Sequence, residues 1–250
     1  MPGEEGAGGE AGACRVFFKE LMSSDFVIDN TVVTPTCARC STLFGVGEVK
    51  EVERRGRITK LRIDDSTALV NLYTDIEMTF KPESFVAFLG NIRIRHHESG
   101  FLILGREMAM VDSTVRDNWI LSTAIRTMRR IELLRSMTPV PAATAWMRKA
   151  LTHYGNINGN SNKLEECEST AIKAVQQLWQ YYNRTAKDVA LDFLNTMDKC
   201  SRERLIAELE KKGLKGAWIE EAIDELIADG MCYEPEAGVL ALVHQQPNAV

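Results

Sequence analysis

The sequence predicts an α+β protein, with a small closed β-barrel near the N-terminus, helices in the middle and a compact, mainly helical domain at the C-terminus. Three observations predict this class. Between residues 43 and 111, β-branched and aromatic residues alternate with polar ones in short runs, as in antiparallel strands. After residue 112 the apolar spacing becomes that of helices. Residues 189–243 then read as three helices followed by a hairpin.

Five strands account for the alternating region. We expect them at residues 43–54, 57–64, 68–74, 85–96 and 101–111, joined by turns rich in Gly, Asp and Ser. A five-stranded barrel of this kind is the OB-fold, whose open face and loops hold single-stranded nucleic acid. In the second strand Leu61 and Ile63 should point inward, which leaves Lys60 and Arg62 on the outer face. Residues 14–21 alternate enough to predict a short edge strand or strap beside the barrel.

An amphipathic helix is expected after the barrel, at residues 113–136. Its broad apolar stripe lies opposite a row of arginines and has to be covered by another surface. That surface is either formed by the protein's own helices or by the helices of other subunits in a bundle, and the periodicity favours neither. The residues predicted for a subunit interface are Trp119, Ile120, Ala124, Met128, Ile131 and Leu134.

The C-terminal residues predict a winged-helix domain. Helices are expected at 189–197, 202–211 and 217–228, with Ser201 as the cap of the second, and a hairpin is expected at 231–243. The third helix carries four carboxylates between residues 220 and 225, which would repel phosphates. We therefore expect this domain to recruit proteins and not to bind DNA.

These segments divide the chain into five parts. We expect a disordered leader at residues 1–13, the OB-fold barrel at 14–112, an assembly helix at 113–136, a helical connector at 137–185 and the winged-helix domain at 186–250. Residues 183–187 are expected to form a linker or a helix boundary.

Charge is distributed unevenly along the chain, although the net charge is only −5. Residues 43–112 carry ten basic and eleven acidic side chains, residues 113–150 carry a net charge of +5, and residues 186–243 carry −6. Nucleic-acid binding gains affinity from Lys and Arg side chains that neutralise phosphates. The acidic C-terminal part is therefore a poor candidate, and the barrel has to bind nucleic acid through a local patch.

Two basic clusters on the barrel predict such a patch. They lie on the turn between the first two strands, with the second strand itself, and on the turn between the last two strands, where OB-folds bind oligonucleotides. Two aromatic residues complete the patch, because exposed rings stack on bases. The predicted nucleic-acid-binding residues are Arg54, Arg55, Arg57, Lys60, Arg62, Tyr73, Arg93, Arg95, His96 and Phe101. The alternative is a solvated sheet surface whose charges balance.

The sequence carries no signature of catalysis and no complete metal site. Asp64 and Asp65 point to opposite faces of a strand, so we interpret them as turn residues and not as an acid–base pair. Cys37 and Cys40 have the spacing of half a zinc site, but no second pair follows, so we expect neither metal nor cofactor. With six Cys and no secretory signal, reduced thiols are the default expectation. No apolar run is long enough to span a bilayer.

Several stretches resemble one known family. They are GVGEV at residues 45–49, IDDSTALV at 63–70, LGNIR at 89–93, NWIL at 118–121, RIE at 130–132 and, most specifically, AIDELIADGMCYEPEAG at 222–238. In these stretches, and in the order of barrel, helix and winged helix, the chain is similar to the middle subunit of replication protein A, most closely to its archaeal form. The resemblance covers residues 16–134 and 189–243. Two departures are Ala68, where the family usually has Gly, and the helices at 141–182, where it usually has a flexible linker.

The resemblance implies a non-enzymatic subunit that binds single-stranded DNA in DNA replication, repair and recombination. It implies assembly with a large and a small OB-fold subunit through helix 113–136, and recruitment of replication and repair proteins by the winged helix. We expect a cytoplasmic, nucleoid-associated protein. The residues alone leave two other functions open, a scaffold whose barrel binds only proteins and an OB-fold in a tRNA-handling protein.

Overall fold

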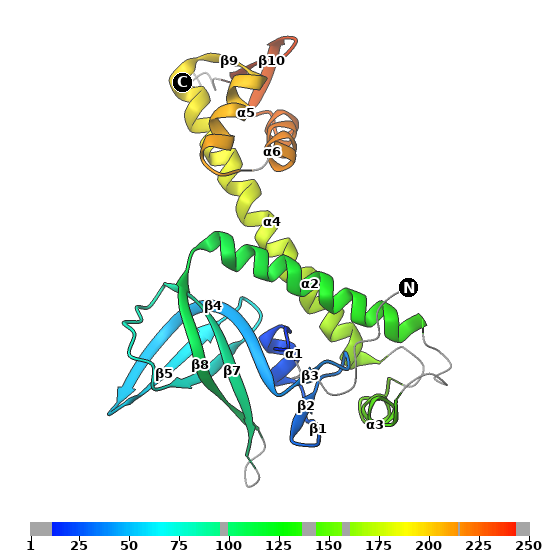
Figure 1. Ribbon diagram of the computed structural model, residues 1–250. Helices are drawn as coiled ribbons and strands as arrows, with labels where there is room; N and C mark the ends of the chain where they lie inside the picture. Colours follow the sequence, from blue (N-terminus) through cyan, green and yellow to red (C-terminus); the bar gives the residue numbers. More distant parts are fainter. Residues whose placement is uncertain (1–11, 96–99, 137–143, 157–160, 215, 244–250) are drawn as a thin grey trace, which may run out of the picture. The chain divides into compact units, whose positions relative to one another are not determined.

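The computed structural model describes residues 12–95, 100–136, 144–156, 161–214 and 216–243 (Figure 1). The chain divides into two compact units, Met1–Val175 and Gln176–Val250. The first unit contains a closed β-barrel with helices, and the second contains helices with a small sheet. The α+β class predicted from the sequence is confirmed.

Five strands of the first unit close into a barrel in the order β4-β5-β6-β8-β7. They are β4 (Thr42–Arg55), β5 (Ile58–Asp64), β6 (Leu69–Thr74), β7 (Phe85–Ile94) and β8 (Phe101–Val111). Neighbouring strands are antiparallel except for β6 and β8. This is the predicted five-stranded OB-type barrel, and each strand begins and ends within two residues of its expected range.

The alternation of side chains along each strand builds the interior of the barrel. Leu61 and Ile63 of β5 are fully buried. Their neighbours Lys60 and Arg62 lie on the outer face, as predicted. Each such burial contributes about 1.5–3 kcal/mol. Gly47 of β4 has no room for a side chain, because an added Cβ would lie 2.6 Å from a backbone oxygen of β5.

The barrel is closed between β6 and β8 by only a short stretch of strand pairing. These strands pair at two positions, Leu72 with Ile103 and Tyr73 with Leu104. The residues of β6 before Leu72 pair with β5 alone. A pocket opens on the surface beside this short junction.

The residues before the barrel form a strap and a short helix. Cys14 makes one parallel bridge to Leu43 of β4, and α1 (Phe18–Met22) follows. Of the edge strand or strap expected at residues 14–21, the strap is present in the first half, and a helix replaces it in the second. Phe18 and Leu21 are both fully buried, which a helical turn permits and an alternating strand does not. The ring of Phe18 lies 6.1 Å from that of Phe88, so α1 adds to the barrel core.

Asp65 ties α1 to the turn between β5 and β6. Its carboxylate accepts hydrogen bonds from the backbone N–H groups of Phe18 (2.7 Å), Thr67 (2.9 Å) and Ala68 (3.1 Å). Ser66 is the residue of this turn that takes the left-handed conformation, with φ of 74°. The turn therefore needs no glycine at position 68, and the interpretation of the acidic pair as turn residues agrees with the structure.

Burial raises the pKa of Asp65 to about 6, although its hydrogen bonds oppose this shift. The ordinary value is 3.8, so between about pH 4 and pH 6 the folded protein holds a proton that the unfolded chain has lost. Asp65 therefore favours folding as the pH falls, by about 2 kcal/mol between pH 7 and pH 4. We expect the difference in unfolding free energy between wild type and Asp65→Asn, measured by urea denaturation, to change by that amount in favour of wild type. The same difference at both pH values would contradict this prediction.

A second sheet precedes the barrel and contains one half of a disulfide. Its strands are β1 (Phe26–Ile28), β2 (Thr31–Val33) and β3 (Arg39–Cys40). Cys40 is bonded to Cys14 of the strap, with Cα atoms 5.2 Å apart. The expectation of reduced thiols is wrong for this pair, because the fold brings together two cysteines that are 26 positions apart. Cys37 remains a buried free thiol.

Helix α2 (Ser113–Ser136) coincides with the helix expected after the barrel. Its apolar stripe is covered by the protein's own chain. Trp119, Ile120, Ala124, Ile131 and Leu134 are buried, and Met128 is half-buried. The ring of Trp119 packs against Phe17 at 5.8 Å, and Ile131 belongs to a cluster with Leu151 and Leu164. Of the two covers left open by the sequence, the structure uses the internal one, so the residues predicted for a subunit interface form a packing surface within this chain.

Two further helices help to cover this stripe. They are α3 (Ala145–His153) and the first part of α4 (Asn162–Met197). Helix α4 runs without a break through residues 183–187, so the linker or helix boundary expected there is wrong. The division between the two units falls inside α4, between Val175 and Gln176, and not at residue 186.

The second unit combines the end of α4 with two helices and a small sheet. Its other elements are β9 (Lys199–Ser201), α5 (Arg202–Lys211), α6 (Gly216–Ala228), β10 (Cys232–Glu236) and β11 (Val239–Leu242). The hydroxyl of Ser201 accepts a hydrogen bond from the N–H of Arg204, which makes it the predicted cap of α5. The expected helices and hairpin are present, and β9 adds an unpredicted third strand in the order β10-β11-β9.

Candidate nucleic-acid interface

The outer face of the barrel brings cations and an aromatic ring into neighbouring rows. Lys60 of β5 is in register with Tyr73 of β6, and Tyr73 is in register with Leu104 of β8. The adjacent row holds Arg62 beside Asn71. Residues directly opposite each other on neighbouring strands lie on the same face of a sheet. The barrel thus presents charge beside an aromatic ring, which is the combination that holds unpaired nucleic acid.

Carboxylates on β4 pair with three of the predicted cations. Glu53 lies 2.5 Å from Arg55 and 3.7 Å from Lys60, and Glu51 lies 2.6 Å from Arg62. The hydrogen bond from Arg55 holds the pKa of Glu53 below its ordinary value. Surface ion pairs of this kind contribute at most about 1 kcal/mol. A phosphate can therefore replace these carboxylates at small cost.

The turn between β4 and β5 carries the other cations of this cluster. Arg54 and Arg57 are exposed, and within the described ranges neither has a carboxylate partner. Gly56 between them takes the left-handed conformation that the tight turn requires, with φ of 61°. This turn is the part of the predicted patch with the most freely available positive charge.

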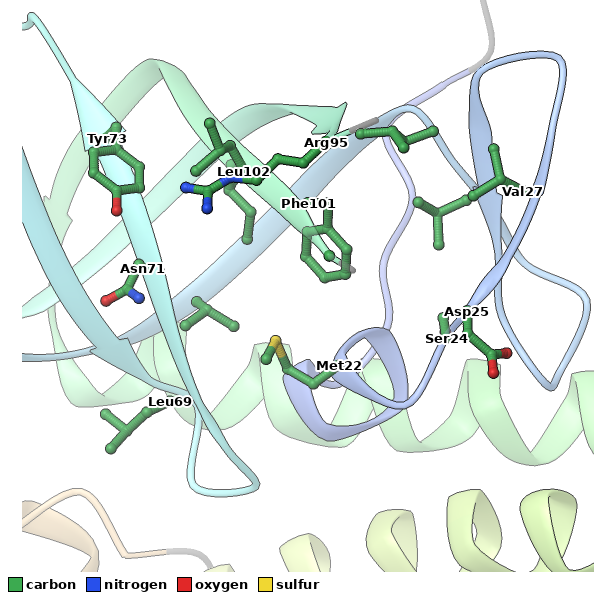
Figure 2. A pocket seen from close by; sticks show the side chains of 15 residues that line it. Met22, Ser24, Asp25, Val27, Leu69, Asn71, Tyr73, Arg95, Phe101 and Leu102 are labelled. Carbon is green, nitrogen blue, oxygen red and sulfur yellow. The ribbon is translucent and has the colours of Figure 1, made fainter. Parts of the chain in front are cut away.

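A pocket of about 540 Å³ lies beside the junction of β6 and β8 (Figure 2). Tyr73, Arg95 and Phe101, all predicted from the sequence, line it together. In Figure 2 the ring of Phe101 lies between Arg95 and Met22, with Tyr73 and Asn71 on the facing strand. Two rings, a guanidinium group and an amide can hold a base by stacking while a cation contacts its phosphate.

The structure joins the two predicted clusters through Tyr73. A second pocket, of about 160 Å³, is lined by Tyr73 together with Glu53, Arg55, Ile58 and Lys60. Tyr73 is therefore shared by the pocket that contains Arg95 and the pocket that contains the β4–β5 cations. A single nucleic-acid strand bound on this face can contact both clusters.

The remaining residues of the second cluster are placed as follows. Arg93 is exposed on β7 and is in register with Leu102 of β8. The backbone N–H of Arg95 donates to the carbonyl of Gly100 (3.1 Å), which holds the start of the β7–β8 connection. His96 lies outside the described residues.

Sequence reasoning missed the lining contributed by other segments. Met22 and Val27, which come from the residues before the barrel, are 57% and 43% exposed and line the large pocket. No periodic signal links this segment to β6 and β8, so only the fold could place it there. Asn71 and Leu102 could have been found, because the same alternation that puts Tyr73 outside also puts them outside.

In the second unit, carboxylates of α6 and β10 bind an arginine of α5. The guanidinium group of Arg202 contacts Glu220 (2.6 Å), Asp224 (2.5 Å) and Glu234 (3.5 Å). These carboxylates raise the pKa of Arg202 above its ordinary value, chiefly through the hydrogen bond to Asp224. Arg202 is thus occupied by carboxylates, and the barrel remains the better candidate for contact with phosphates.

In the part of the chain that the structure describes, no group of three or more potential metal ligands occurs, and no helix has the length and apolar character to cross a membrane. Burial raises the pKa of Cys37 to about 12, so this thiol stays protonated at neutral pH and is a poor nucleophile.

Comparison with known proteins gives distant similarities. No protein-family model and no curated protein matches the chain. Among solved structures, the chain is similar to a protein chain of the S. pombe Stn1–Ten1 complex, with 12% sequence identity and a TM-score of 0.40. The match covers 46% of this chain and 90% of the other chain. It is also similar to a protein chain of a replication protein A heterotrimer bound to single-stranded DNA, with 14% sequence identity and a TM-score of 0.41. This match covers 46% of this chain and 94% of the other chain. A third is the OBody AM3L09 bound to hen egg-white lysozyme, at 16% identity and a TM-score of 0.24 over 28% and 81%.

Proposed function

We propose that this chain is a non-enzymatic subunit that binds single-stranded DNA within a replication protein A-like complex in DNA replication, repair and recombination. One observation carries the proposal. The outer face of the barrel gathers Tyr73, Phe101 and Arg95 at one pocket, with Lys60 in the row beside it. Rings that stack on any base and cations that contact the backbone suit a strand of arbitrary sequence.

The pairing of charges on this face favours one alternative. Because Glu51 and Glu53 neutralise part of the cationic cluster, the barrel also suits a scaffold that binds a protein and no nucleic acid. The two functions differ in their response to salt. Phosphate binding releases counterions from the nucleic acid, so its affinity falls steeply as salt rises.

We expect the full chain to bind oligo(dT), with an affinity that falls as salt rises by a slope of about −0.7 for each phosphate contacted. Fluorescence anisotropy over a series of salt concentrations measures this slope. The variant Arg54→Ala/Arg57→Ala removes the two unpaired cations of the β4–β5 turn and should flatten the slope by about 1.4. The variant Arg148→Ala/Lys149→Ala, on exposed positions of α3, removes the same charge and should leave the slope unchanged. Absence of oligo(dT) binding by the wild type would favour the protein-binding scaffold.

The wider assembly forms part of the same proposal. We infer a large and a small OB-fold subunit as partners, with contacts on the exposed side of α2, where Ile125 and Leu133 are 52% and 55% accessible. The second unit, with its order helix, strand, two helices and hairpin, is interpreted as a winged helix that recruits replication and repair proteins. The expected location is the cytoplasm, at the nucleoid, in an archaeal cell.

A further inference from the structure

Two arginines lie together on the side of the barrel where the strap meets α2, and the strand-binding face described above does not include them. They are Arg15 of the strap and Arg126 of α2, which lies one helical turn before Arg130, whose guanidinium group donates to the backbone carbonyl of Arg15. The pKa of Arg15 is lowered, first by burial and then by the positive charge of Arg126. Neither arginine has a carboxylate partner in the described part of the chain. Two like charges at a partly buried place repel each other, and an anion between them would relieve this cost.

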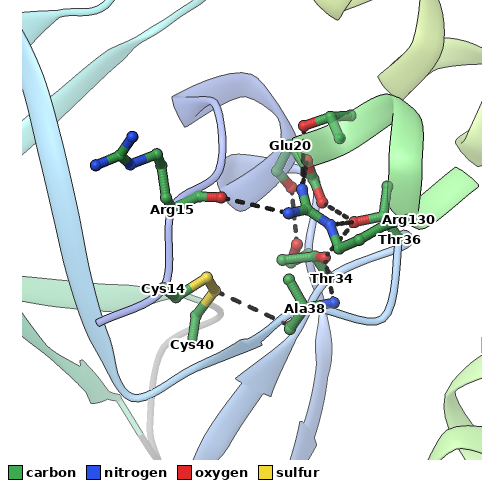
Figure 3. Close-up of a disulfide and its surroundings, with 10 residues drawn as sticks. Cys14, Arg15, Glu20, Thr34, Thr36, Ala38, Cys40 and Arg130 are labelled. Carbon is green, nitrogen blue, oxygen red and sulfur yellow. Dashed lines mark hydrogen bonds and ion pairs between the residues drawn. A yellow bond between two sulfur atoms is a disulfide. The ribbon is translucent and has the colours of Figure 1, made fainter. Parts of the chain in front are cut away.

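The position of Arg15 is fixed by its surroundings. The strap is hydrogen-bonded to β4 on both sides of Cys14, from its N–H to Thr42 (2.7 Å) and from the N–H of Phe44 to its carbonyl (2.8 Å). The backbone carbonyl of Arg15 accepts a hydrogen bond from Arg130 (3.5 Å). Figure 3 shows the guanidinium group of Arg15 directed away from this contact and from the disulfide. It lies over the ring of Phe44, 4.7 Å from the ring centre.

A continuous row of outer-face residues connects the large pocket with this place. Tyr73 of β6 is in register with Leu104 of β8, which is in register with Asn91 of β7. Asn91 is in register with Thr42 of β4 and accepts a hydrogen bond from its hydroxyl (3.3 Å). Phe44 lies two positions further along β4, on the same face. Three steps of about 4.8 Å between strands separate β6 from β4, or about 14 Å in all.

We propose that Arg15 and Arg126 form a second phosphate-binding site, reached by a single strand that leaves the pocket at Tyr73 and continues round the barrel over Asn91 to Phe44. The inference rests on the proposed function and extends it. A distance of about 14 Å is short enough for one single strand to reach both places within the ~4–16 nucleotides that an OB-fold covers. The ring of Phe44 beside the guanidinium group supplies a base contact next to a phosphate contact, the pairing that also occurs at Tyr73 and Lys60. This repeated pairing favours a nucleic-acid strand over an acidic protein segment.

The test measures the affinity of the full chain for oligo(dT) of about 2, 4, 8 and 16 nucleotides, of which the shortest cannot span the two places. In the wild type we expect affinity to rise with length until the strand reaches both sites. In Arg15→Gln/Arg126→Gln, binding of the shortest oligonucleotide should be unchanged, while the longer ones should bind about tenfold more weakly. Their salt slope should be smaller by about 1.4, because two phosphate contacts are lost. Arg148→Gln/Lys149→Gln serves as the control with the same loss of charge.

The outcomes separate the inference from the proposed function. If the wild type binds no oligonucleotide, both fail. If the double variant binds every length like the wild type, or weakens short and long oligonucleotides equally, the second site is overturned while strand binding at the pocket stands. The single variant Arg126→Gln changes only an exposed side chain, so it is not expected to disturb folding and controls for misfolding of the double variant. It should give part of the same length-dependent loss, and a length-independent effect would count against the inference.

Discussion

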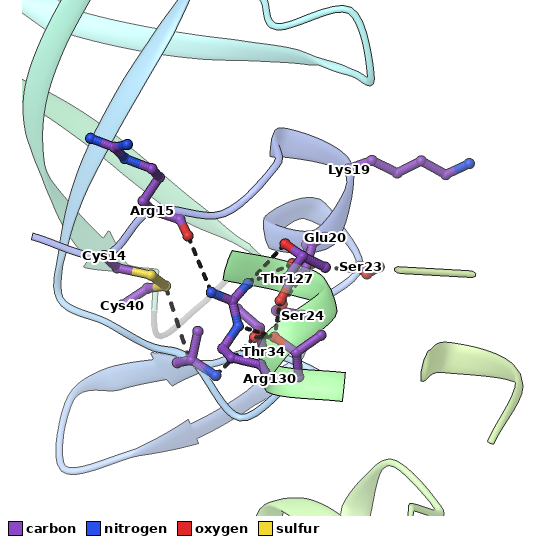
Figure 4. A network of polar contacts seen from close by, with 12 residues as sticks. Cys14, Arg15, Lys19, Glu20, Ser23, Ser24, Thr34, Cys40, Thr127 and Arg130 are labelled. Carbon is purple, nitrogen blue, oxygen red and sulfur yellow. Dashed lines mark hydrogen bonds and ion pairs between the residues drawn. A yellow bond between two sulfur atoms is a disulfide. The ribbon is translucent and has the colours of Figure 1, made fainter. Parts of the chain in front are cut away.

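Replacing Glu20 with alanine is expected to lower the free energy of unfolding by about 3–5 kcal/mol. Glu20 lies on α1 and is 2% exposed. Its carboxylate accepts hydrogen bonds from the hydroxyl of Thr36 (2.5 Å) and from Arg130 of α2 (3.3 Å). Arg130 also donates to Thr36 (2.7 Å) and to Thr127 (3.0 Å), and Figure 4 shows Glu20, Thr127 and Arg130 of this network. The alanine variant leaves the guanidinium group of Arg130 without its counter-charge.

The second ion pair of α2 with an acidic residue from another helix provides the control. Arg135 contacts Glu168 of α4 at 2.6 Å, and their side chains are 37% and 24% exposed. Water screens this pair, so Glu168→Ala should cost no more than about 1 kcal/mol. Urea denaturation of both variants measures the two losses. Equal losses would show that burial does not strengthen the Glu20 network, and the double variant Glu20→Met/Arg130→Met should recover much of the stability by removing both charges.

Replacing both rings of the large pocket is expected to weaken oligo(dT) binding by about thirtyfold or more. Stacking on an aromatic side chain contributes about 1–3 kcal/mol per base, and Tyr73 and Phe101 together supply two such contacts. Leucine is the better replacement, because Phe101 also packs against the barrel core. The measurement is anisotropy at low salt with Tyr73→Leu/Phe101→Leu, whose salt slope should equal that of wild type because no charge has changed.

A tyrosine outside the barrel gives the matched control. Tyr181 of α4 is 60% exposed and belongs to the second unit. Tyr181→Leu should bind oligo(dT) like the wild type. Wild-type affinity in the Tyr73→Leu/Phe101→Leu variant would remove the pocket from strand binding and would leave only the charged turn.

The barrel could be predicted in detail because each of its strands carries its own local signal. Alternation of period two fixed the strand bounds and the inward side of Leu61 and Ile63, since a strand sends successive side chains to opposite faces. The same rule placed Lys60 and Arg62 outside. Helix α2 could be predicted equally well from the spacing of its apolar residues. Helix α1 was not, because five residues are too few for a period to emerge.

The functional face was predictable in its residue types and not in its neighbours. Alternation says that Lys60 is outside, but the register of β4 against β5 decides that Glu53 lies opposite and pairs with it. Alternation places Phe101 on the same side of β8 as the buried Ile103, and only the short β6–β8 junction decides that its ring shares a pocket with Tyr73. Pairings between segments distant in sequence leave no periodic trace in either segment.

By itself the sequence determined the α+β class, the five strands, the long helix after them and the kinds of residue available to a strand of nucleic acid, because these depend on local periodicity and side-chain chemistry. Only the tertiary structure decided that the stripe of α2 is covered from within, that Cys14 meets Cys40, and that Arg130 of α2 reaches the backbone of Arg15. Such contacts depend on how complete elements pack, and many arrangements share the same local pattern.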